Sequence, residues 1–281
     1  MTLVAYHLLR INRSASTLHI VITDVHLRAI DGAAIGVLGH VTRLGRPNAL
    51  AVTPYVVDGR LLVTSTLALI DKAAALRLDP RVTLTAGGVA VSGTACVEVD
   101  TSPAFFDRSV RRQELMKYPP ARSLLSIPCH RRLLPWYVGR VAIWIEPNEV
   151  AVQPATDDTT VTVVDQRGRL VTTSIERPAD LDADVLRVGE VPSGPAVLLV
   201  HAEDTAMRDL RQLGRHGRVV DGALHVERRR GSLASHRTGT LDELRTLRAL
   251  AAKARANRAQ LATWPPIGSP STPKPRRGTP S

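Results

Sequence analysis

The sequence predicts a mainly β protein with flanking helices (α+β): a six-stranded antiparallel split β-barrel, then a smaller α+β C-terminal region and a disordered tail. Short apolar runs separated by turn residues have the spacing of a small antiparallel barrel. Aromatic residues make up only 3% of the chain, so Val, Ile, Leu and Ala must fill the core. Pro, Ser, Gly and basic residues dominate after Thr263, and such a composition cannot bury enough apolar surface to fold.

The elements of the barrel are expected in order within residues 1–154. Apolar residues at helical spacing predict a helix over residues 17–33, which ends at Asp31-Gly32. The Asp58-Gly59 and Gly87-Gly88 pairs predict tight hairpin turns. Strands are expected over residues 34–42, 49–57, 60–66, 81–86, 89–100, 138–145 and 150–153, with helices over 68–78 and 103–118.

Residues 155–262 are expected to form a second, α+β domain, and residues 263–281 a disordered tail. A helix over 241–261 has an apolar stripe and is expected to dock on the core of this second domain. The segment around Asp221-Gly222 echoes the one around Asp58-Gly59, which leaves a degenerate second barrel as an alternative. Strands are expected over residues 159–164, 170–174, 196–201 and 219–226, with a helix over 205–213.

The charge balance is strongly basic, with 37 Lys and Arg against 26 Asp and Glu. Nucleic acid is nevertheless not the favoured partner, because no helix-turn-helix pattern, aromatic RNA-binding signature or zinc finger accompanies the charge. Cys96 and Cys129 show no CxxC spacing and cannot build a disulfide framework. The apolar runs are too short to span a bilayer. We expect a cytoplasmic protein with no metal site and no membrane association.

The residues that carry chemistry lie around the third strand and the helix after it. Thr64, Ser65 and Thr66 place hydroxyls just before a predicted helix, where free amides and the helix dipole favour an anion. Lys72, about one and a half turns into that helix, has a side chain long enough to reach the same anion. Taken alone, a helix cap and a surface lysine would be the simpler interpretation.

The order of motifs around these residues resembles that of the pyridoxamine 5′-phosphate oxidase-like split-barrel superfamily. A Gly-x-Pro turn at Gly45, the Asp58-Gly59 hairpin, a strand ending in hydroxyls, a helical Lys72 and an Asp-Pro-Arg-Val run from Asp79 follow one another as in that family. The strand over residues 91–99 is similar to the family's VxGxAxV strand. The resemblance covers roughly half of the chain.

The resemblance implies a bound FMN or, alternatively, a deazaflavin coenzyme. The second strand faces the isoalloxazine ring in the family. The cofactor-binding residues that it implies are Thr53, Thr64, Ser65, Thr66 and Lys72. It also implies a homodimer with the flavin in a shared cleft, unless the second half of the chain folds back as an internal partner.

Two departures from the family pattern limit the resemblance. Asp71 stands where FMN-binding members commonly carry a basic residue. The second strand has apolar residues 49–51 where true pyridoxamine phosphate oxidases have an arginine, so vitamin B6 oxidation is not expected. Residues that would supply positive charge for a polyglutamyl deazaflavin tail are Arg46, Arg77, Arg111 and Arg112.

The function implied is a flavin- or deazaflavin-dependent oxidoreductase that transfers hydride between the cofactor and a small substrate. No catalytic side chain is assigned, because the cofactor supplies the chemistry. The alternatives are a non-catalytic carrier or sensor of a flavin- or haem-type ligand and, third, a basic protein associated with nucleic acid. No GxSxG, P-loop or GxGxxG motif points to another enzyme class.

Overall fold

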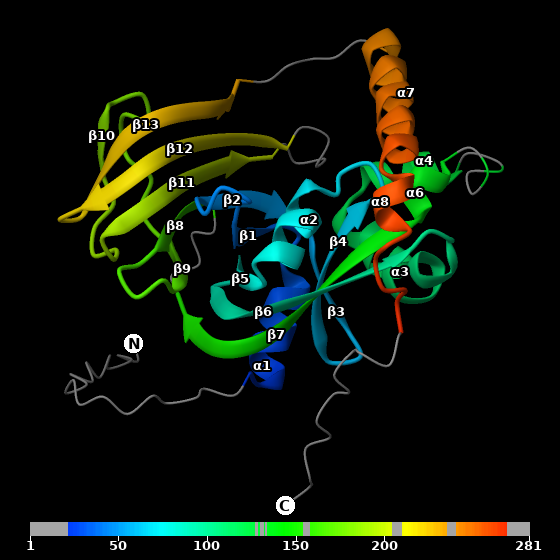
Figure 1. Ribbon diagram of the computed structural model, residues 1–281, viewed down its shortest axis with the longest axis horizontal. Helices are drawn as coiled ribbons and strands as arrows, with labels where there is room; N and C mark the ends of the chain where they lie inside the picture. The colour runs from blue at the N-terminus through cyan, green and yellow to red at the C-terminus, as the bar shows by residue number, and fades with distance from the viewer. Residues whose placement is uncertain are drawn as a thin grey trace, which may run out of the picture.

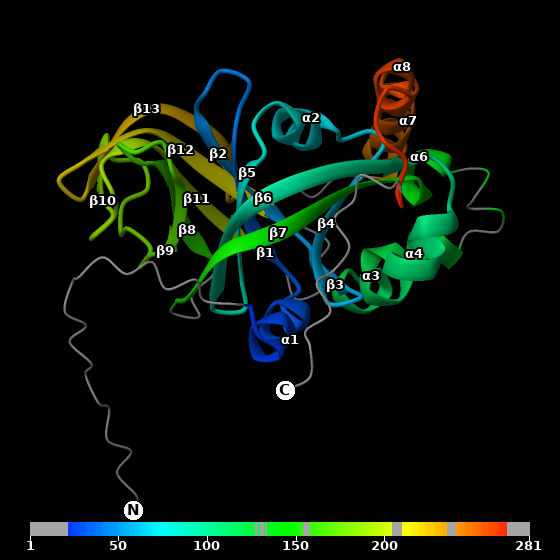
Figure 2. The same cartoon turned by 60° about the horizontal axis from the view of Figure 1, so that its bottom comes forward.

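The computed structural model describes residues 22–126, 129, 132, 134–153, 158–203, 210–234 and 240–268, without the side chains of residues 240–243. This part of the chain forms two antiparallel sheets that lie against each other, and most of the helices gather around the first sheet (Figures 1 and 2). The expected helix over residues 17–33 is observed as α1 (Asp24–Gly32), while residues 17–21 lie outside the described part.

The first sheet closes on itself as a barrel. Its order is β2-β1-β5-β6-β7-β4-β3, so β2 and β3 lie at opposite ends. These two strands are separated in sequence only by Thr53, and the two ends of the sheet are therefore joined by the chain itself. Counted as one strand, as the sequence predicted over residues 49–57, they give a six-stranded barrel. The strands are β1 (Gly36–Val41), β2 (Pro47–Val52), β3 (Pro54–Val57), β4 (Arg60–Thr66), β5 (Arg81–Ala86), β6 (Val89–Asp100) and β7 (Arg140–Val152).

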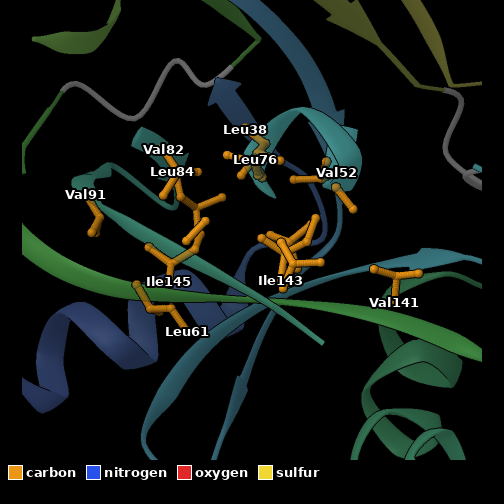
Figure 3. Packing of buried hydrophobic residues seen from close by; sticks show 14 of the residues in the cluster. Leu38, Val52, Leu61, Leu76, Val82, Leu84, Val91, Val141, Ile143 and Ile145 are labelled. Carbon is orange, nitrogen blue, oxygen red and sulfur yellow. The ribbon is translucent and has the colours of Figure 1, made fainter. Parts of the chain in front are cut away.

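The interior of the barrel is filled by branched aliphatic side chains from all of its strands (Figure 3). Leu38, Leu84, Val91 and Ile143 have no exposed surface. Full burial of a side chain of this size contributes about 1.5–3 kcal/mol, so this core positions the strand ends that build the site.

The helices attached to the barrel differ in detail from the sequence prediction. The helix expected over residues 68–78 begins later, as α2 (Asp71–Leu78), because backbone bonds from Leu67 to Trp136 and from Leu69 to Thr66 hold the preceding residues in a turn. The helix expected over 103–118 divides into a π-helical turn, η1 (Phe106–Val110), and α3 (Arg111–Lys117). Two short helices follow, α4 (Pro120–Ser126) and α6 (Pro135–Val138).

The second sheet has six strands in the order β10-β13-β12-β11-β8-β9. The helix expected over residues 205–213 is not supported, because Arg211 to Leu213 pair with β11 as part of β12 and residues 204–209 lie outside the described part. Cross-strand pairing has overridden a weak local preference. The strands are β8 (Thr159–Val164), β9 (Leu170–Ser174), β10 (Val185–Arg187), β11 (Gly194–Ala202), β12 (Arg211–Val220) and β13 (Ala223–Ser232).

The two sheets share one strand order. Take β2 and β3 as one strand and number the strands of each sheet along the chain. The spatial order in the first sheet is then 2-1-4-5-6-3. The second sheet, read from β9 to β10, has the same order. The contacts between the sheets are also paired: β2 with β11 matches β9 with β5, and β2 with β8 matches β9 with β1. This is the pattern that a two-fold related pair of subunits produces.

The first hairpin of each sheet shows the same repeat at the level of single bonds. Thr42 accepts a backbone bond from Gly45 and donates one to Arg46, and Asp165 does the same with Gly168 and Arg169. The two glycines have φ of 72° and 74°. These observations favour the second-copy alternative, although the Asp58-Gly59 and Asp221-Gly222 turns that suggested it join non-equivalent strands.

The C-terminal helices return to the barrel. The predicted helix is observed as α7 (Thr240–Ala256) and α8 (Arg258–Leu261), but the expectation that it docks on the second core is wrong. Its apolar residues pack on clusters of the first half, and Asn257 donates to the carbonyl of Leu67 at 2.9 Å. The predicted disorder also begins too early, because Trp264 is buried in the barrel core and Ile267 donates to the carbonyl of Val99.

Candidate functional site

A pocket of about 390 Å³ opens at the end of the barrel beside the Thr53 junction. The five residues predicted from the sequence all line it: Thr53, Thr64, Ser65, Thr66 and Lys72. The junction between β2 and β3 supplies the first, the end of β4 the next three and the start of α2 the last. The structure thus brings the predicted residues together, while their ligand is a separate question.

The hydroxyls at the end of β4 are not equivalent. Ser65 donates to the carbonyl of Leu69 at 2.8 Å, so its proton is already used in the turn before α2. The hydroxyl of Thr66 is buried without a hydrogen-bond partner. A buried polar atom without a partner costs about 1–3 kcal/mol, which a ligand that accepts from Thr66 would recover.

Lys72 lies in the first turn of α2, not one and a half turns into it, because the helix starts at Asp71. Its side chain is half-buried, and burial together with the charge of Arg140 lowers the pKa of its ammonium group to about 8. His40 of β1 is buried nearby, and burial and the charge of Lys72 lower the pKa of its imidazole to about 4. The surroundings of Lys72 are therefore short of negative charge.

Arg140 is the main site residue that sequence reasoning missed. It stands directly opposite Thr66 in the ladder between β4 and β7 and is 2% exposed. Its guanidinium pairs with Glu114 at 3.0 Å and donates to the carbonyl of Tyr137. The Nε atom of Arg140 has no hydrogen-bond partner. Only its position just after Gly139 at the start of a strand could have signalled it.

Glu114 organises the wall behind Arg140. It accepts hydrogen bonds from the hydroxyls of Tyr55 and Tyr137, the latter at 2.7 Å. Burial and the neighbouring carboxylate raise the pKa of both phenols, so they stay protonated as donors. The single carboxylate is thereby fully engaged and leaves little negative charge facing Lys72.

The rest of the pocket is mainly apolar and comes from segments outside the barrel. Trp136 of α6 and Leu124 of α4 form one side, and Leu247 and Leu250 of α7 close another. The carboxylate of Asp71, the departure noted in the sequence, pairs with Lys253 of α7 at 3.1 Å. The C-terminal helix is thus tied to the start of α2 and helps to exclude water from the site.

The four arginines considered for a deazaflavin tail do not line this pocket. Arg46 lies in a separate cleft, and Arg77 stacks on Trp264. Arg111 pairs with Asp107 on its own helical segment. The positive charge at the site comes from Lys72 and Arg140 instead, and among the described residues no cluster of His, Cys, Asp and Glu could hold a metal ion.

The site fits an anionic group such as a phosphate monoester. Two cations and an unpaired hydroxyl line a cavity that is otherwise mainly apolar, and the one acid among its lining residues, Glu114, is occupied by its own partners. A phosphate would give Thr66 Oγ1, Arg140 Nε and the Lys72 ammonium the acceptor that each lacks. The cavity volume lies within the range of about 300–1,000 Å³ that is usual for small-molecule sites.

Comparison with known proteins gives likenesses of structure only. No protein-family model matches the chain, and no curated protein does. A conserved hypothetical protein from Mycobacterium tuberculosis aligns with 49% of this chain and 88% of its own, at 19% identity and a TM-score of 0.36. General stress protein 26 from Bacillus anthracis aligns over 44% and 86%, at 19% identity and a TM-score of 0.32. An FAD-binding protein from Mesorhizobium loti aligns over 46% and 92%, at 16% identity and a TM-score of 0.31.

With TM-scores this low, these likenesses carry no argument about function. The class of the protein therefore rests on its own architecture: a six-stranded antiparallel barrel closed at Thr53, with an anion-fitting pocket at the end of β4. No helix in the described residues is long and apolar enough to cross a bilayer.

Proposed function

We propose that this chain is a flavin- or deazaflavin-dependent oxidoreductase that transfers hydride between its cofactor and a small substrate. FMN is the favoured cofactor and a deazaflavin coenzyme the alternative. The observation that carries the proposal is the meeting of Lys72, Arg140 and the unpaired hydroxyl of Thr66 at the polar end of one pocket. The resemblance in the order of motifs supports the same ligand class.

The phosphate end of the cofactor is held, in this proposal, by Lys72, Thr66 and the free edge of Arg140. Glu114 keeps Arg140 in place from behind, because it bonds the far side of the guanidinium. Thr53 and Thr64 line the same pocket and would contact other parts of the cofactor. Each charge-assisted bond to a phosphate contributes about 1.5–3 kcal/mol.

The ring of the bound cofactor supplies the hydride chemistry. The chain's own residues orient that ring and keep water away from it, with the apolar wall of Trp136, Leu247 and Leu250 as the barrier. Tyr55 and Tyr137 hold their protons on Glu114, and we assign neither as an acid or a base.

The state of assembly follows from the position of the second sheet. The family resemblance implies a homodimer unless the second half of the chain folds back as an internal partner. The second sheet packs across β1, β2 and β5 in the manner of such a partner. We therefore expect a monomer of 30.4 kDa in light scattering. Cys96 and Cys129 are free thiols, and we propose the reducing cytoplasm as the compartment.

The test begins with the purified full-length protein. Its absorption spectrum and the mass of any released ligand identify the cofactor, and titration of the ligand-free protein with FMN and with a deazaflavin gives the two affinities. Lys72→Ala should weaken binding of the preferred cofactor tenfold or more. Arg167→Ala is the control for the loss of a surface cation, because that arginine is exposed on the β8–β9 turn and does not line the pocket. Unchanged affinity in the Lys72 variant would remove the proposed site.

Turnover separates the enzyme from a carrier or sensor. Oxidation of the reduced cofactor by a panel of small acceptors, faster with protein than without it, supports the oxidoreductase. Tight binding with no acceleration supports the non-catalytic alternative. A protein that binds neither cofactor contradicts both.

A further inference from the structure

A second cleft lies between the two sheets, at the opposite end of β2 from the cofactor pocket. It has a volume of about 220 Å³ and is lined by the β1–β2 turn and by the middle of β12. Arg46 from the turn, and His216 and Arg218 from β12, are part of its wall. Because β2 runs from Pro47 to Val52, the two sites are separated by about 17 Å of strand.

The neighbouring strand adds further positive charge to this cleft. Arg228 of β13 stands directly opposite His216, and Arg230 stands opposite Gly214. Side chains alternate between the faces of a strand, so Arg228 and Arg230 share the face of His216. That face is turned toward the barrel, since Gln212 of the same β12 face accepts a hydrogen bond from the backbone of Ala51.

The arginines of the cleft differ from their neighbours on the other face of the sheet. Arg215 pairs with Asp182, and Arg229 pairs with Asp184. The side chains of four arginines at or beside the cleft have no ion pair or hydrogen bond among the described residues: Arg46, Arg218, Arg228 and Arg230. One carboxylate, that of Glu227, also lines the cleft, which leaves a large excess of positive charge.

The floor of the cleft is a β-bulge. The pairing of β12 with β13 shifts between His216 and Gly217, and a Cβ added to Gly217 would lie 1.8 Å from the carbonyl oxygen of His225. His216 stands directly at this bulge and lines the cleft. Burial and the charges of Arg228, Arg230 and Arg46 lower the pKa of this imidazole to about 4, so it is neutral and can donate a hydrogen bond.

The repeat of the fold supplies an internal comparison. The barrel has the same bulge between Ser92 and Gly93, where an added Cβ would lie 2.2 Å from the carbonyl oxygen of Glu146. At this bulge Ser92 takes the place of His216, and Glu149 takes the place of Arg228. The bulge can therefore be built without a basic residue, and the arginines of the cleft are not required by the fold.

The remaining equivalent positions lead to the same conclusion. Arg169, the counterpart of Arg46 in the second sheet, pairs with Asp165 at 2.8 Å. Arg81, at the start of β5 near that turn, is bound by Asp79 and donates to the carbonyl of Gly168. Beside the β8–β9 turn Arg169 and Arg81 both have an acidic partner, whereas the side chains of Arg46, Arg218, Arg228 and Arg230 have none among the described residues.

We propose that the cleft lined by Arg46, His216 and Arg218 is a second binding site for a compact anion with several charges, such as the oligophosphate of a small phosphorylated molecule. Arg228 and Arg230, beside it on β13, would add to its positive charge. The cavity is small, about 220 Å³, and lies between the two sheets, which favours a small anion over a polymer. This site is independent of the proposed cofactor pocket.

The experiment titrates the full-length protein with inorganic tripolyphosphate and measures binding by isothermal titration calorimetry. Saturable binding is expected at one site per chain that Lys72→Ala leaves unchanged, together with a shift of the His216 imidazole signals in NMR spectra. Arg228→Gln combined with Arg230→Gln should weaken binding at least tenfold. Arg229→Gln, on the adjacent residue but on the opposite face, should change the affinity less than twofold.

Thermal unfolding separates a structural effect from a binding effect. Because the four arginines repel one another, the double variant should unfold at the same temperature as the wild type or at a higher one. No saturable binding, or an equal loss in the Arg229 variant, overturns the proposal. Tighter binding of single-stranded RNA than of tripolyphosphate, lost in the double variant, would also overturn it and assign the cleft to nucleic acid.

Discussion

The barrel and the second sheet have the same strand order, but the first is closed and the second is open. In the barrel, the second strand continues through Thr53 and pairs at both ends, with β1 and with β4. In the second sheet, the equivalent β9 ends at Ser174, and ten residues (175–184) separate it from the start of β10 at Val185. The described residues show no pairing of β9 with β10, so this sheet stays an open half-barrel.

The difference explains why the barrel, and not the second sheet, has the residues of the proposed cofactor pocket. The third strand of the barrel is followed by α2 with Lys72, whereas only residues 188–193 separate β10 from β11. The connection from β6 to β7 carries Glu114, Trp136 and Tyr137, whereas β12 and β13 are joined by the two-residue turn at Asp221. A shared strand order thus supplies the frame, and the connections supply the chemistry.

The largest effect is expected where a buried charge loses its partner. Glu114→Ala leaves the guanidinium of Arg140 buried, and we expect a loss of about 3–5 kcal/mol in the free energy of unfolding. Asp182→Ala is the matched change in the second sheet. Its partner Arg215 is also buried, but Asp182 is itself exposed and Arg215 keeps a bond to the carbonyl of Leu181, so we expect about 0–1 kcal/mol. Urea unfolding measures both, and equal losses would contradict the contrast.

A similar loss in the free energy of unfolding is expected when Trp264, the C-terminal residue of the barrel core, is replaced. Trp264→Ala removes a side chain that is 6% exposed, and the cost of such a cavity is about 3–5 kcal/mol. Hydrogen exchange should show the loss in β6 and leave β11 protected. Truncation after Gly268 is the control and should leave unfolding and cofactor binding unchanged. Exchange that rises first in the second sheet would mean that this segment belongs to that sheet.

The two bulges test whether the repeated fold has repeated energetics. Gly93→Ala and Gly217→Ala each force a Cβ against a carbonyl oxygen, and overpacking of this kind costs about 1–3 kcal/mol. Gly32→Ala is the control, because its added Cβ meets nothing within 4 Å. Thermal unfolding compares the three. A neutral Gly217 variant beside a costly Gly93 variant would break the structural equivalence of the bulges.

The smallest effect concerns the pH dependence of stability. Folding lowers the pKa of Lys72 from 10.5 to about 8. Between about pH 8 and pH 10.5 the unfolded chain therefore binds a proton that the folded chain has lost, and the free energy of unfolding rises with pH across this window. Lys72→Met should lack this part of the rise in urea unfolding at pH 7 to 11. Bound phosphate should restore the pKa, so cofactor affinity should fall above about pH 8. Identical pH profiles for the wild type and the variant would show that Lys72 is not perturbed.

The sequence predicted the barrel well because its signals are local. The Asp58-Gly59 turn, the alternating apolar strands and the hydroxyls from Thr64 to Thr66 all depend on neighbours in the chain. Arg140 and Glu114 escaped prediction because their pairing joins a strand start to a helix 26 residues away. The docking of α7 escaped for the same reason: an apolar stripe shows that a helix packs, but not on which core.

The pairing of Val99 with residues 265–267 has a consequence for biosynthesis. Domains nearest the N-terminus usually fold first during translation. Here the barrel, whose strands are made before the second sheet, is completed by Trp264, which is made only after that sheet. Until Trp264 arrives, the nascent barrel exposes an apolar gap in its core, and contacts between such distant segments form slowly. Chaperone dependence during synthesis should therefore be concentrated in the barrel.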